Sequence, residues 1–320
     1  MIRTAKRWMR IVVAVATVVF AAACGSPVEG GDNGDDDEPS SPGVTSVLAA
    51  GGSHTCAIQA SEEVECWGSS YYGQDETFAG AFSDISAGMR HSCGIDIGEL
   101  THCWGDDREG QSDAPELDFV QVSAGTLHSC GVTAGGQAHC WGDDGSERAS
   151  PPGEEFVQVS AGHDHSCGVD TEGDVHCWGA NVYGQSDAPQ GQFEQVGAGA
   201  RHSCGLDVDG EIECWGGGDE EAEPPEPGEE QEYRTWAPSG TFAELSVGHD
   251  HSCAIDDEGD VQCWGPDTTG RTEVPEEGLF TEVAAGMDHS CAVDADGQIH
   301  CWGSDAQGQA TPPQIEIGVD

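Results

Sequence analysis

Apolar and polar positions alternate along most of this chain, in short stretches that end at Gly, Asp or Pro. Residues 119–125 (FVQVSAG), 128–132 (HSCGV) and 139–142 (HCWG) are one example, followed by a polar loop that ends at a proline. A period of two over five or six residues is typical of short, half-buried β-strands. Each such group of three stretches therefore predicts one small three-stranded antiparallel sheet.

The three-strand unit occurs seven times, and each copy contains two cysteines ten residues apart, the second always followed by Trp-Gly. A unit this small cannot bury both faces of its sheet alone, so the copies must stack into a ring or an open solenoid. Seven copies suit a closed ring. The prediction is an all-β fold, a seven-bladed β-propeller of three-stranded repeats of about 37 residues, over residues 44–320.

Each pair of cysteines flanks a predicted hairpin. Between Cys167 and Cys177 the chain folds at Glu172, which places the two cysteines opposite each other. Directly opposed Cβ atoms in a hairpin lie about 4.5–5.5 Å apart, close to the span of a disulfide, and each such loop contributes about 2–3 kcal/mol in the chain-entropy estimate. The predicted disulfides are Cys56–Cys66, Cys93–Cys103, Cys130–Cys140, Cys167–Cys177, Cys204–Cys214, Cys253–Cys263 and Cys291–Cys301.

The same alternation assigns faces to the hairpin. Cys130 and Cys140 share one face, and Trp141 lies on the other face, over Gly131. The residue after the first cysteine is Gly or Ala in every copy. A residue this small is expected where the tryptophan ring or a neighbouring unit's backbone occupies the adjacent space. The seven repeated tryptophans are therefore expected to be core residues.

The N-terminus has the pattern of an export signal. A basic segment, residues 1–10, precedes thirteen apolar residues, which is short of the roughly 20 that a membrane-spanning helix needs. Residues 1–23 are therefore expected to be a signal peptide. Residues 21–24 (AAAC) resemble a bacterial lipobox, which makes Cys24 the expected lipidation site and residues 24–43 an acidic Gly/Ser/Pro tether. An ordinary cleaved signal with an incidental cysteine remains the alternative.

The strongly negative net charge of the chain limits the kinds of partner that it can bind. The chain has 60 Asp and Glu against 10 Lys and Arg, for a formal charge of −50, and no lysine follows Lys6. Such a surface repels phosphate backbones and anionic lipid headgroups, and it favours basic partners or bound cations. Nucleic acid is therefore excluded as an expected partner, and the membrane is expected to be contacted only through the N-terminal lipid.

The repeat resembles that of the regulator of chromosome condensation family. Its pattern is Val-x-Ala-Gly-x-x-His-Ser-Cys, then Gly-x-(Val/Ile)-x-Cys-Trp-Gly and Gly-Gln, and the clearest copies are residues 159–185 and 283–309. The short unit is most similar to the secreted branch that includes β-lactamase inhibitor protein II. The resemblance implies a seven-bladed propeller with three-stranded blades. It implies little about activity, since propellers carry many functions, and no contact residue can be carried over.

The repeated histidines, cysteines and acids suggest zinc or calcium binding, but their pattern fits structural roles better. The histidine two residues before each first cysteine recurs seven times, which indicates a structural hydrogen bond to backbone. A Cys₂His₂ zinc site using His102 and Cys103 is disfavoured because neighbouring strand residues point to opposite faces. Asp207–Gly210 and Asp294–Gly297 are similar to the start of a calcium loop but fit turns better, so no cofactor and at most weak surface calcium is expected.

One repeat is longer than the others, through an acidic insertion at residues 217–240. Tyr233, Arg234 and Trp236 within it are of the three types enriched at binding hot spots, so they are the candidate binding residues. The alternative is a solvated acidic flap whose tryptophan packs back on the propeller. After the last repeat, residues 315–317 could add a closing strand to the first blade or fray.

The sequence contains none of the usual catalytic motifs. The expected function is a non-catalytic extracytoplasmic protein-binding scaffold, lipid-anchored in a bacterial cell envelope, with a disulfide-stapled propeller. Its partner is expected to be a basic or cation-bridged protein, and the chain itself a monomer. The alternatives are an envelope hydrolase or lyase that uses carboxylates at the propeller channel, and a proteinaceous inhibitor of a secreted enzyme.

Overall fold

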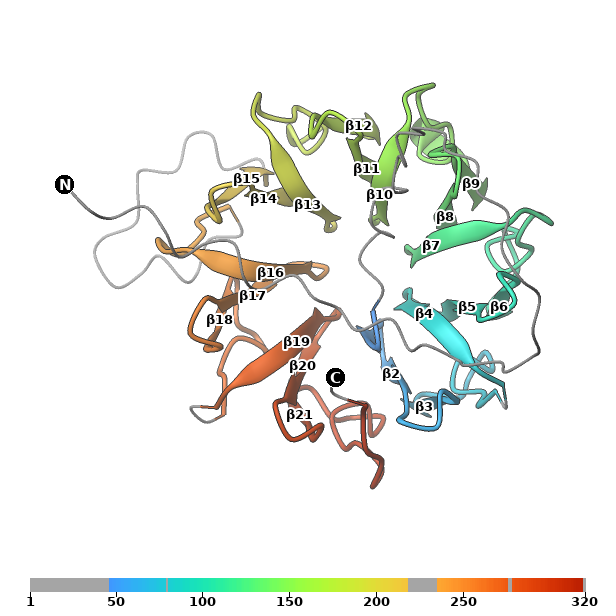
Figure 1. Ribbon diagram of the computed structural model, residues 1–320, viewed down its shortest axis with the longest axis vertical. Coiled ribbons are helices and arrows are strands. Elements are labelled where there is room, and N and C mark those ends of the chain that lie inside the picture. The colour runs from blue at the N-terminus through green and yellow to red at the C-terminus, as the bar shows by residue number, and fades with distance from the viewer. Residues whose placement is uncertain (1–45, 79, 218–234, 276–277, 319–320) are drawn as a thin grey trace, which may run out of the picture. The chain divides into compact units, whose positions relative to one another are not determined.

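Seven three-stranded antiparallel sheets, one from each repeat, are arranged as the blades of a β-propeller in a computed structural model (Figure 1). The structure describes residues 46–78, 80–217, 235–275 and 278–318. Within each sheet the strands follow chain order, and the first strand lies nearest the centre of the ring (Figure 1). The prediction of an all-β, seven-bladed propeller is therefore confirmed.

The inner strands are β1 (Leu48–Ala50), β4 (Phe82–Ala87), β7 (Phe119–Ala124), β10 (Phe156–Ala161), β13 (Phe193–Ala198), β16 (Phe242–Val247) and β19 (Phe280–Ala285). The middle strands are β2 (His54–Ile58), β5 (His91–Asp96), β8 (His128–Thr133), β11 (His165–Asp170), β14 (His202–Asp207), β17 (Ser252–Asp256) and β20 (His289–Asp294). The outer strands are β3 (Val64–Gly68), β6 (Thr101–Gly105), β9 (Ala138–Gly142), β12 (Val175–Gly179), β15 (Ile212–Gly216), β18 (Val261–Trp264) and β21 (Ile299–Gly303). In the described ranges one 3₁₀ turn, η1 (Gly145–Glu147), is the sole helical element, and no helix there is long and apolar enough to cross a bilayer.

The hairpin of middle and outer strands has the register expected from the cysteine spacing. In the fourth blade, Cys167 pairs with Cys177 and Ser166 pairs with Trp178. All seven cysteine pairs are bonded in this way, with Cα atoms 4.0 Å apart. The glycine after each tryptophan ends the hairpin. At Gly142, φ is +99° and a Cβ would lie 2.7 Å from the Leu127 carbonyl oxygen, so only glycine fits.

The core lies between blades. The disulfide face of one blade packs against the phenylalanine, valine and tryptophan of the next, as where Cys130 and Val132 contact Phe156, Val159 and Trp178. Seven clusters of this kind alternate with the seven blades. Each disulfide is thus part of an interface, and each tryptophan is a core residue as expected.

One expectation about this core is wrong. Where the residue after the first cysteine is glycine, it is covered by the phenylalanine of the blade's own inner strand, and neither the tryptophan nor a neighbouring unit's backbone fills the space. A Cβ at Gly168 would lie 2.6 Å from Cδ1 of Phe156, and Gly131 and Gly205 meet Phe119 and Phe193 at the same distance. The ring of an aromatic residue 12 positions earlier therefore sets the size limit.

A closed series of side-chain hydrogen bonds joins the blades. His91 Nε2–H donates to Ser129 Oγ of the next blade at 2.8 Å, and that hydroxyl donates to the Gln111 carbonyl, which also accepts from Trp141 Nε1. The seven pairs are His54–Ser92, His91–Ser129, His128–Ser166, His165–Ser203, His202–Ser252, His251–Ser290 and His289–Thr55. The last pair returns to the first blade, so the series forms a complete ring.

Backbone hydrogen bonds form a second ring, at the end of the inner strands. Met89 N–H donates to the Gly125 carbonyl of the next blade, and corresponding bonds follow around the centre until Met287 N–H donates to the Gly51 carbonyl. The turns between inner and middle strands are therefore fixed relative to one another. Side chains that extend from these turns start from well-defined positions.

The last described residues contribute to closure. Ile317 is buried between the seventh and first blades, its N–H donates to the Gly297 carbonyl, and Ala60 N–H donates to the Glu316 carbonyl. In five other blades the first inner-strand residue, a phenylalanine, makes the bond that Ile317 makes here. Residues 315–317 therefore do not fray, and they close the ring without forming a regular strand.

Candidate functional site

The seven repeated histidines are structural, but their hydrogen-bond partner differs from the expected one. Each ring is fully buried and bonds the hydroxyl of the next blade, where the sequence analysis expected backbone. Within the described residues, Nδ1 of six of these rings has no hydrogen-bond partner: those of His54, His91, His128, His165, His251 and His289. Burial lowers their pKa, to about 3 for His54 and His128 and to about 4 for His91, His165 and His289.

The second histidine of some repeats belongs to a hairpin. His176 Nε2 lies 2.7 Å from Asp170 Oδ2, and His102 and His300 make the same pair with Asp96 and Asp294. The neighbouring cysteines are all in disulfides, which excludes the Cys₂His₂ zinc site. Among described residues, no group of three or more His, Cys, Asp or Glu side chains is arranged to hold a metal ion.

The two sequences that are similar to calcium loops are hairpin turns. Asp207 Oδ1 accepts hydrogen bonds from the backbone N–H groups of Asp209 and Glu211, and Asp294 Oδ1 accepts from Asp296 and Gln298. These are turns closed by an aspartate side chain on its own backbone. The turn interpretation accounts for both segments.

The candidate binding residues of the insertion are only partly described. Tyr233 and Arg234 lie outside the described residues, as does Cys24. Trp236 has 42% of its surface exposed and lines a pocket of about 580 Å³ beside Trp264. The other six repeated tryptophans donate Nε1–H to a backbone carbonyl of the loop that enters their blade. Nε1 of Trp264 is buried and has no hydrogen-bond partner among the described residues. The insertion replaces that loop at the sixth blade.

The channel along the propeller axis is lined by polar side chains of the inner strands. At one equivalent position these are Asp84, Gln121, Gln158, Gln195 and Glu244, which line a cavity of about 230 Å³, and Glu282, which bonds the inner strand of the first blade. Each accepts a backbone N–H from the next blade, as Gln158 Oε1 does from Val196 and Glu244 Oε1 does from Val283. These side chains therefore satisfy the free edge of the neighbouring inner strand.

Three of these six side chains are acids, and burial raises the pKa of all three. The pKa of Asp84 is raised to about 7, even though it accepts N–H groups from Ser46 and Val122. The pKa of Glu244 is raised well above its usual value by burial and by nearby Glu282, and burial also raises that of Glu282. Perturbed carboxyls in a channel suggest catalysis, but glutamine makes the same bonds in three blades, so the geometry assigns these acids a structural role.

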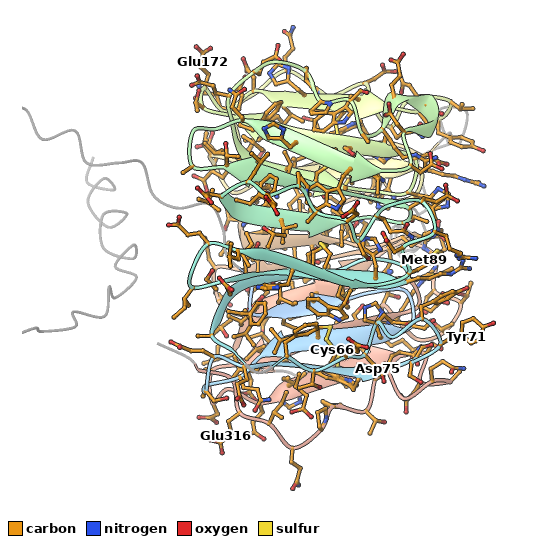
Figure 2. All side chains as sticks on the ribbon, turned by 90° about the vertical axis from the view of Figure 1, so that its right-hand side faces the viewer. Cys66, Tyr71, Asp75, Met89, Glu172 and Glu316 are labelled. Carbon is orange, nitrogen blue, oxygen red and sulfur yellow. A yellow bond between two sulfur atoms is a disulfide. The ribbon has the colours of Figure 1, made fainter. Side chains whose placement is uncertain are left out.

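The two ends of the propeller differ in composition. Figure 2 shows Tyr71 and Met89 at one edge of the molecule and Glu172 and Glu316 at the opposite edge. We call the first the loop face, since it contains the blade-to-blade loops and the turns after the inner strands. We call the second the hairpin face. Its turns, such as residues 170–174 and 207–211, are rich in acids and contain no arginine.

All five described arginines belong to the loop face: Arg90, Arg108, Arg148, Arg201 and Arg271. Arg90 and Arg108 lie over the Tyr72 ring, at 5.2 and 5.1 Å from its centroid, and Arg201 lies 4.7 Å from that of Tyr183. Tyr71 packs edge-on against Tyr72 and is 83% exposed. The loop face therefore combines the residue types that are enriched at protein interfaces.

The channel opens on the loop face through a mouth with a volume of about 90 Å³. The residue after the turn glycine borders this opening in six of the seven repeats, in the order Gly52, Met89, Thr126, His163, His249 and Met287. His163 and His249 have ring centroids 5.5 Å apart, with planes at 81°. The mouth thus brings together residues of all seven repeats, and its longer side chains, those of Met89, Thr126, His163, His249 and Met287, come from five of them.

The loop-face arginines, the tyrosines and the mouth were not predicted from the sequence. A signal for the mouth existed, because Gly-His-Asp-His-Ser-Cys occurs in two repeats, at residues 162–167 and 248–253. The first histidine of that motif departs from the repeat, while the second is the repeated structural one. Departures from a repeat are where single-copy function is expected.

Six of the seven repeats match a family model, that of the Regulator of chromosome condensation (RCC1) repeat. The matched residues are 46–74, 119–147, 156–185, 193–220, 242–270 and 280–309, more than half of the chain. No curated protein sequence matches the chain.

Several solved structures share the fold. The ectodomain of the Physcomitrella patens receptor kinase CR4 is 23% identical with a TM-score of 0.66, over 81% of this chain and 73% of that one. The CRINKLY ectodomain of Arabidopsis thaliana receptor kinase ACR4 is 22% identical with a TM-score of 0.66, over 86% and 100%. Yeast RCC1 (Prp20), solved with Kap60 bound, is 16% identical with a TM-score of 0.65, over 95% and 89%. At these identities the likeness concerns the fold.

We predict that stability falls as the pH drops from 7 to 5. Six buried imidazoles, including His251, have lowered pKa values, so the unfolded chain binds protons below about pH 6.5 that the folded chain does not. The three channel carboxyls act oppositely, since their contribution is lost as pH rises, but they are fewer. Urea unfolding at both pH values should give a loss of a few kcal/mol per pH unit. Equal midpoints at pH 7 and pH 5 would contradict this.

Replacing Glu244→Gln should stabilise the protein by about 1 kcal/mol at pH 8. Glutamine can accept from Val283 N–H and donate to its carbonyl, as Gln158 does with Val196, without a buried charge. Because the pKa of Glu244 is raised, the wild-type carboxyl is neutral at low pH, and the difference should vanish near pH 4. Urea unfolding at both pH values measures the effect, with exposed Glu194→Gln as the control. A destabilised Glu244→Gln variant at pH 8 would disprove the proposed role.

Proposed function

Because this chain belongs to the family of Regulator of chromosome condensation (RCC1) repeat proteins, we propose that it is a non-catalytic scaffold that binds a protein partner. The binding surface is the loop face. The observation that carries the proposal is the gathering of all five described arginines and the Tyr71–Tyr72 and Tyr183 rings on that face. Aromatic rings and arginine guanidinium groups provide most of the energy at known interfaces.

The partner is a basic protein or one bridged by cations. The propeller without the insertion has 46 acids and five arginines, so its field attracts positive charge and repels nucleic acid. Arg108, Arg148 and Arg271 are each paired with an aspartate, so these three arginines neutralise only a small part of the propeller's negative charge. Arg90 and Arg201, stacked on tyrosine rings, serve as local anchors for acceptor groups of the partner.

The insertion extends this surface. It begins directly after the fifth blade's outer strand, where Gly217 N–H donates to the Arg201 carbonyl on the loop face. Trp236, with 42% of its surface exposed, supplies a further aromatic contact beside the pocket at Trp264. Tyr233 and Arg234 are proposed to act with it. Yeast RCC1, which shares the fold, was solved with the protein Kap60 bound, and this supports protein binding by such a propeller.

The protein functions outside the cytoplasm. Seven disulfides in one domain indicate an oxidising compartment, since cytosolic thiols are kept reduced. We propose that residues 1–23 direct export, that Cys24 carries a lipid, and that residues 24–43 tether the monomeric propeller to a bacterial envelope membrane.

Photo-cross-linking in intact cells tests the binding surface. A photoreactive phenylalanine analogue at Tyr71 or at Tyr183 should give a cross-linked partner, while the same analogue at Glu172 on the hairpin face should not. The cross-link at Tyr71 should weaken when Arg90→Ala removes the stacked guanidinium. Mass spectrometry identifies the product. Cross-links of equal yield from Glu172, or from that position alone, would show that the loop face is not the binding surface.

The anchor is tested with Cys24→Ser. The wild-type protein should sediment with membranes after a high-salt wash and incorporate an alkyne-tagged fatty acid, because acylation provides the membrane affinity. The Cys24→Ser variant should do neither, while the neighbouring Ser26→Ala variant should behave as wild type. Unlabelled wild-type protein in the soluble fraction would favour the alternative of a simple cleaved signal.

A further inference from the structure

The mouth of the channel contains four side chains with metal-binding atoms, on a fixed frame. His163, His249, Met89 and Met287 all border the same opening of about 90 Å³. Each follows a turn glycine, and its own backbone N–H is bonded to the next blade, so the four side chains start from positions set by the ring. Arg148 and Arg271 add to this rigidity by donating to the carbonyls of His163 and Met287 at 2.8 and 2.7 Å.

Both histidines are oriented by an aspartate. His163 Nδ1 lies 2.8 Å from Asp164 Oδ2, and His249 Nδ1 lies 2.9 Å from Asp250 Oδ2. A carboxylate beside Nδ1 places the proton there, which leaves the Nε2 lone pair to bind a ligand. Among the described residues no hydrogen-bond partner is found for Nε2 of either ring. A carboxylate bonded to the other ring nitrogen is what metal-ligating histidines almost always have.

The spacing of the two rings allows them to share one ion. Their centroids are 5.5 Å apart, and the blade between them contributes only Ala198 and Gly199 to the mouth, which are too small to separate the rings. A metal about 2.0 Å from a ring nitrogen lies roughly 3 Å from the ring centroid. One ion can therefore bind both Nε2 atoms at an open angle that leaves space for a further ligand.

The methionines decide the class of metal. Met89 and Met287 are the only methionines after Met9, and both are at this mouth. Thioether sulfur is a soft ligand that binds Cu(I) and contributes little to harder ions such as Mg²⁺ or Ca²⁺, whereas zinc sites favour thiolate, imidazole and carboxylate. Every propeller cysteine is locked in a disulfide, so thioether and imidazole are the soft donors that an oxidising compartment leaves available.

We infer that the channel mouth is a binding site for a soft monovalent metal ion of the Cu(I) class, with His163 and His249 as nitrogen ligands and Met89 and Met287 as sulfur ligands. Asp164 and Asp250 fix the histidine tautomer. The site lies at the centre of the loop face, and none of its four ligands is an arginine or a tyrosine proposed to bind a partner. Its existence is therefore independent of the proposed function.

Silver(I) is the appropriate probe because it mimics Cu(I) and needs no reductant, which keeps the disulfides intact. The oxidised, mature protein should bind one Ag⁺ in a chloride-free calorimetric titration. His163→Ala and His249→Ala should each weaken binding at least about tenfold, whereas exposed His139→Ala should leave it unchanged. A melting curve for each variant confirms that the propeller remains folded.

Methionine labelling reports on the sulfur ligands directly. Mature protein with ¹³C-methyl methionine should give two methyl resonances, from Met89 and Met287, and both should shift with one equivalent of Ag⁺. Met89→Leu and Met287→Leu assign the signals. Three results would overturn the inference: no saturable binding at micromolar Ag⁺, binding that survives the double His163→Ala, His249→Ala change, or binding without any methyl shift. Tighter binding of Zn²⁺ than of Ag⁺ would also overturn it.

Discussion

The hydrogen bond from each buried imidazole to a hydroxyl of the next blade holds the propeller together. The hydroxyl that accepts it, as at Ser129, donates in turn to the loop carbonyl that also receives the indole N–H. One bond therefore fixes the distance between two blades, the path of the connecting loop and the position of the tryptophan. The arrangement requires a neutral ring, because in six of the seven rings Nδ1 has no described partner. Protonation of these imidazoles would bury an N–H group without an acceptor, so the ring is most stable while they stay neutral.

The centre of the ring presents a related problem. A propeller's inner strands have one free edge, whose N–H groups must be bonded although no further strand is present. Side chains from the preceding blade supply the acceptors, amides in Gln121, Gln158 and Gln195 and carboxyls in Asp84, Glu244 and Glu282. The acids are clustered in blades six, seven and two, on both sides of the first blade. There Glu282 accepts three hydrogen bonds, from Ser46, Val47 and Leu48. A carboxylate has more acceptor lone pairs than the single oxygen of an amide, so it accommodates three donors better.

Features within a single repeat could be predicted from the sequence, and features between repeats could not. The strands, the hairpin register and the cysteine pairing depend on residues about ten positions apart, so the period of two and the constant spacing were sufficient. The serine partner of each histidine lies 38 or more residues away, and only the ring geometry brings it close. Ile317 in the last interface follows the same rule, whereas the phenylalanine over Gly168 is an exception, since it belongs to the same repeat and lies only 12 positions away. The mouth was missed for a further reason, because averaging over seven copies hides the two in which His163 and His249 differ.

The disulfides link residues only within single hairpins, and in the described part of the chain no disulfide joins one blade to another. For each first cysteine the correct partner is the next cysteine along the chain. A chain that emerges from a membrane N-terminus first can form the disulfide of each repeat before the following repeat appears. The fourteen cysteines then form seven independent pairs, each between two cysteines of the same hairpin. Duplication or loss of one repeat also leaves no unpaired thiol. Blade number in such proteins is therefore free to change over evolution at no cost in redox pairing, and it is limited only by the geometry of ring closure.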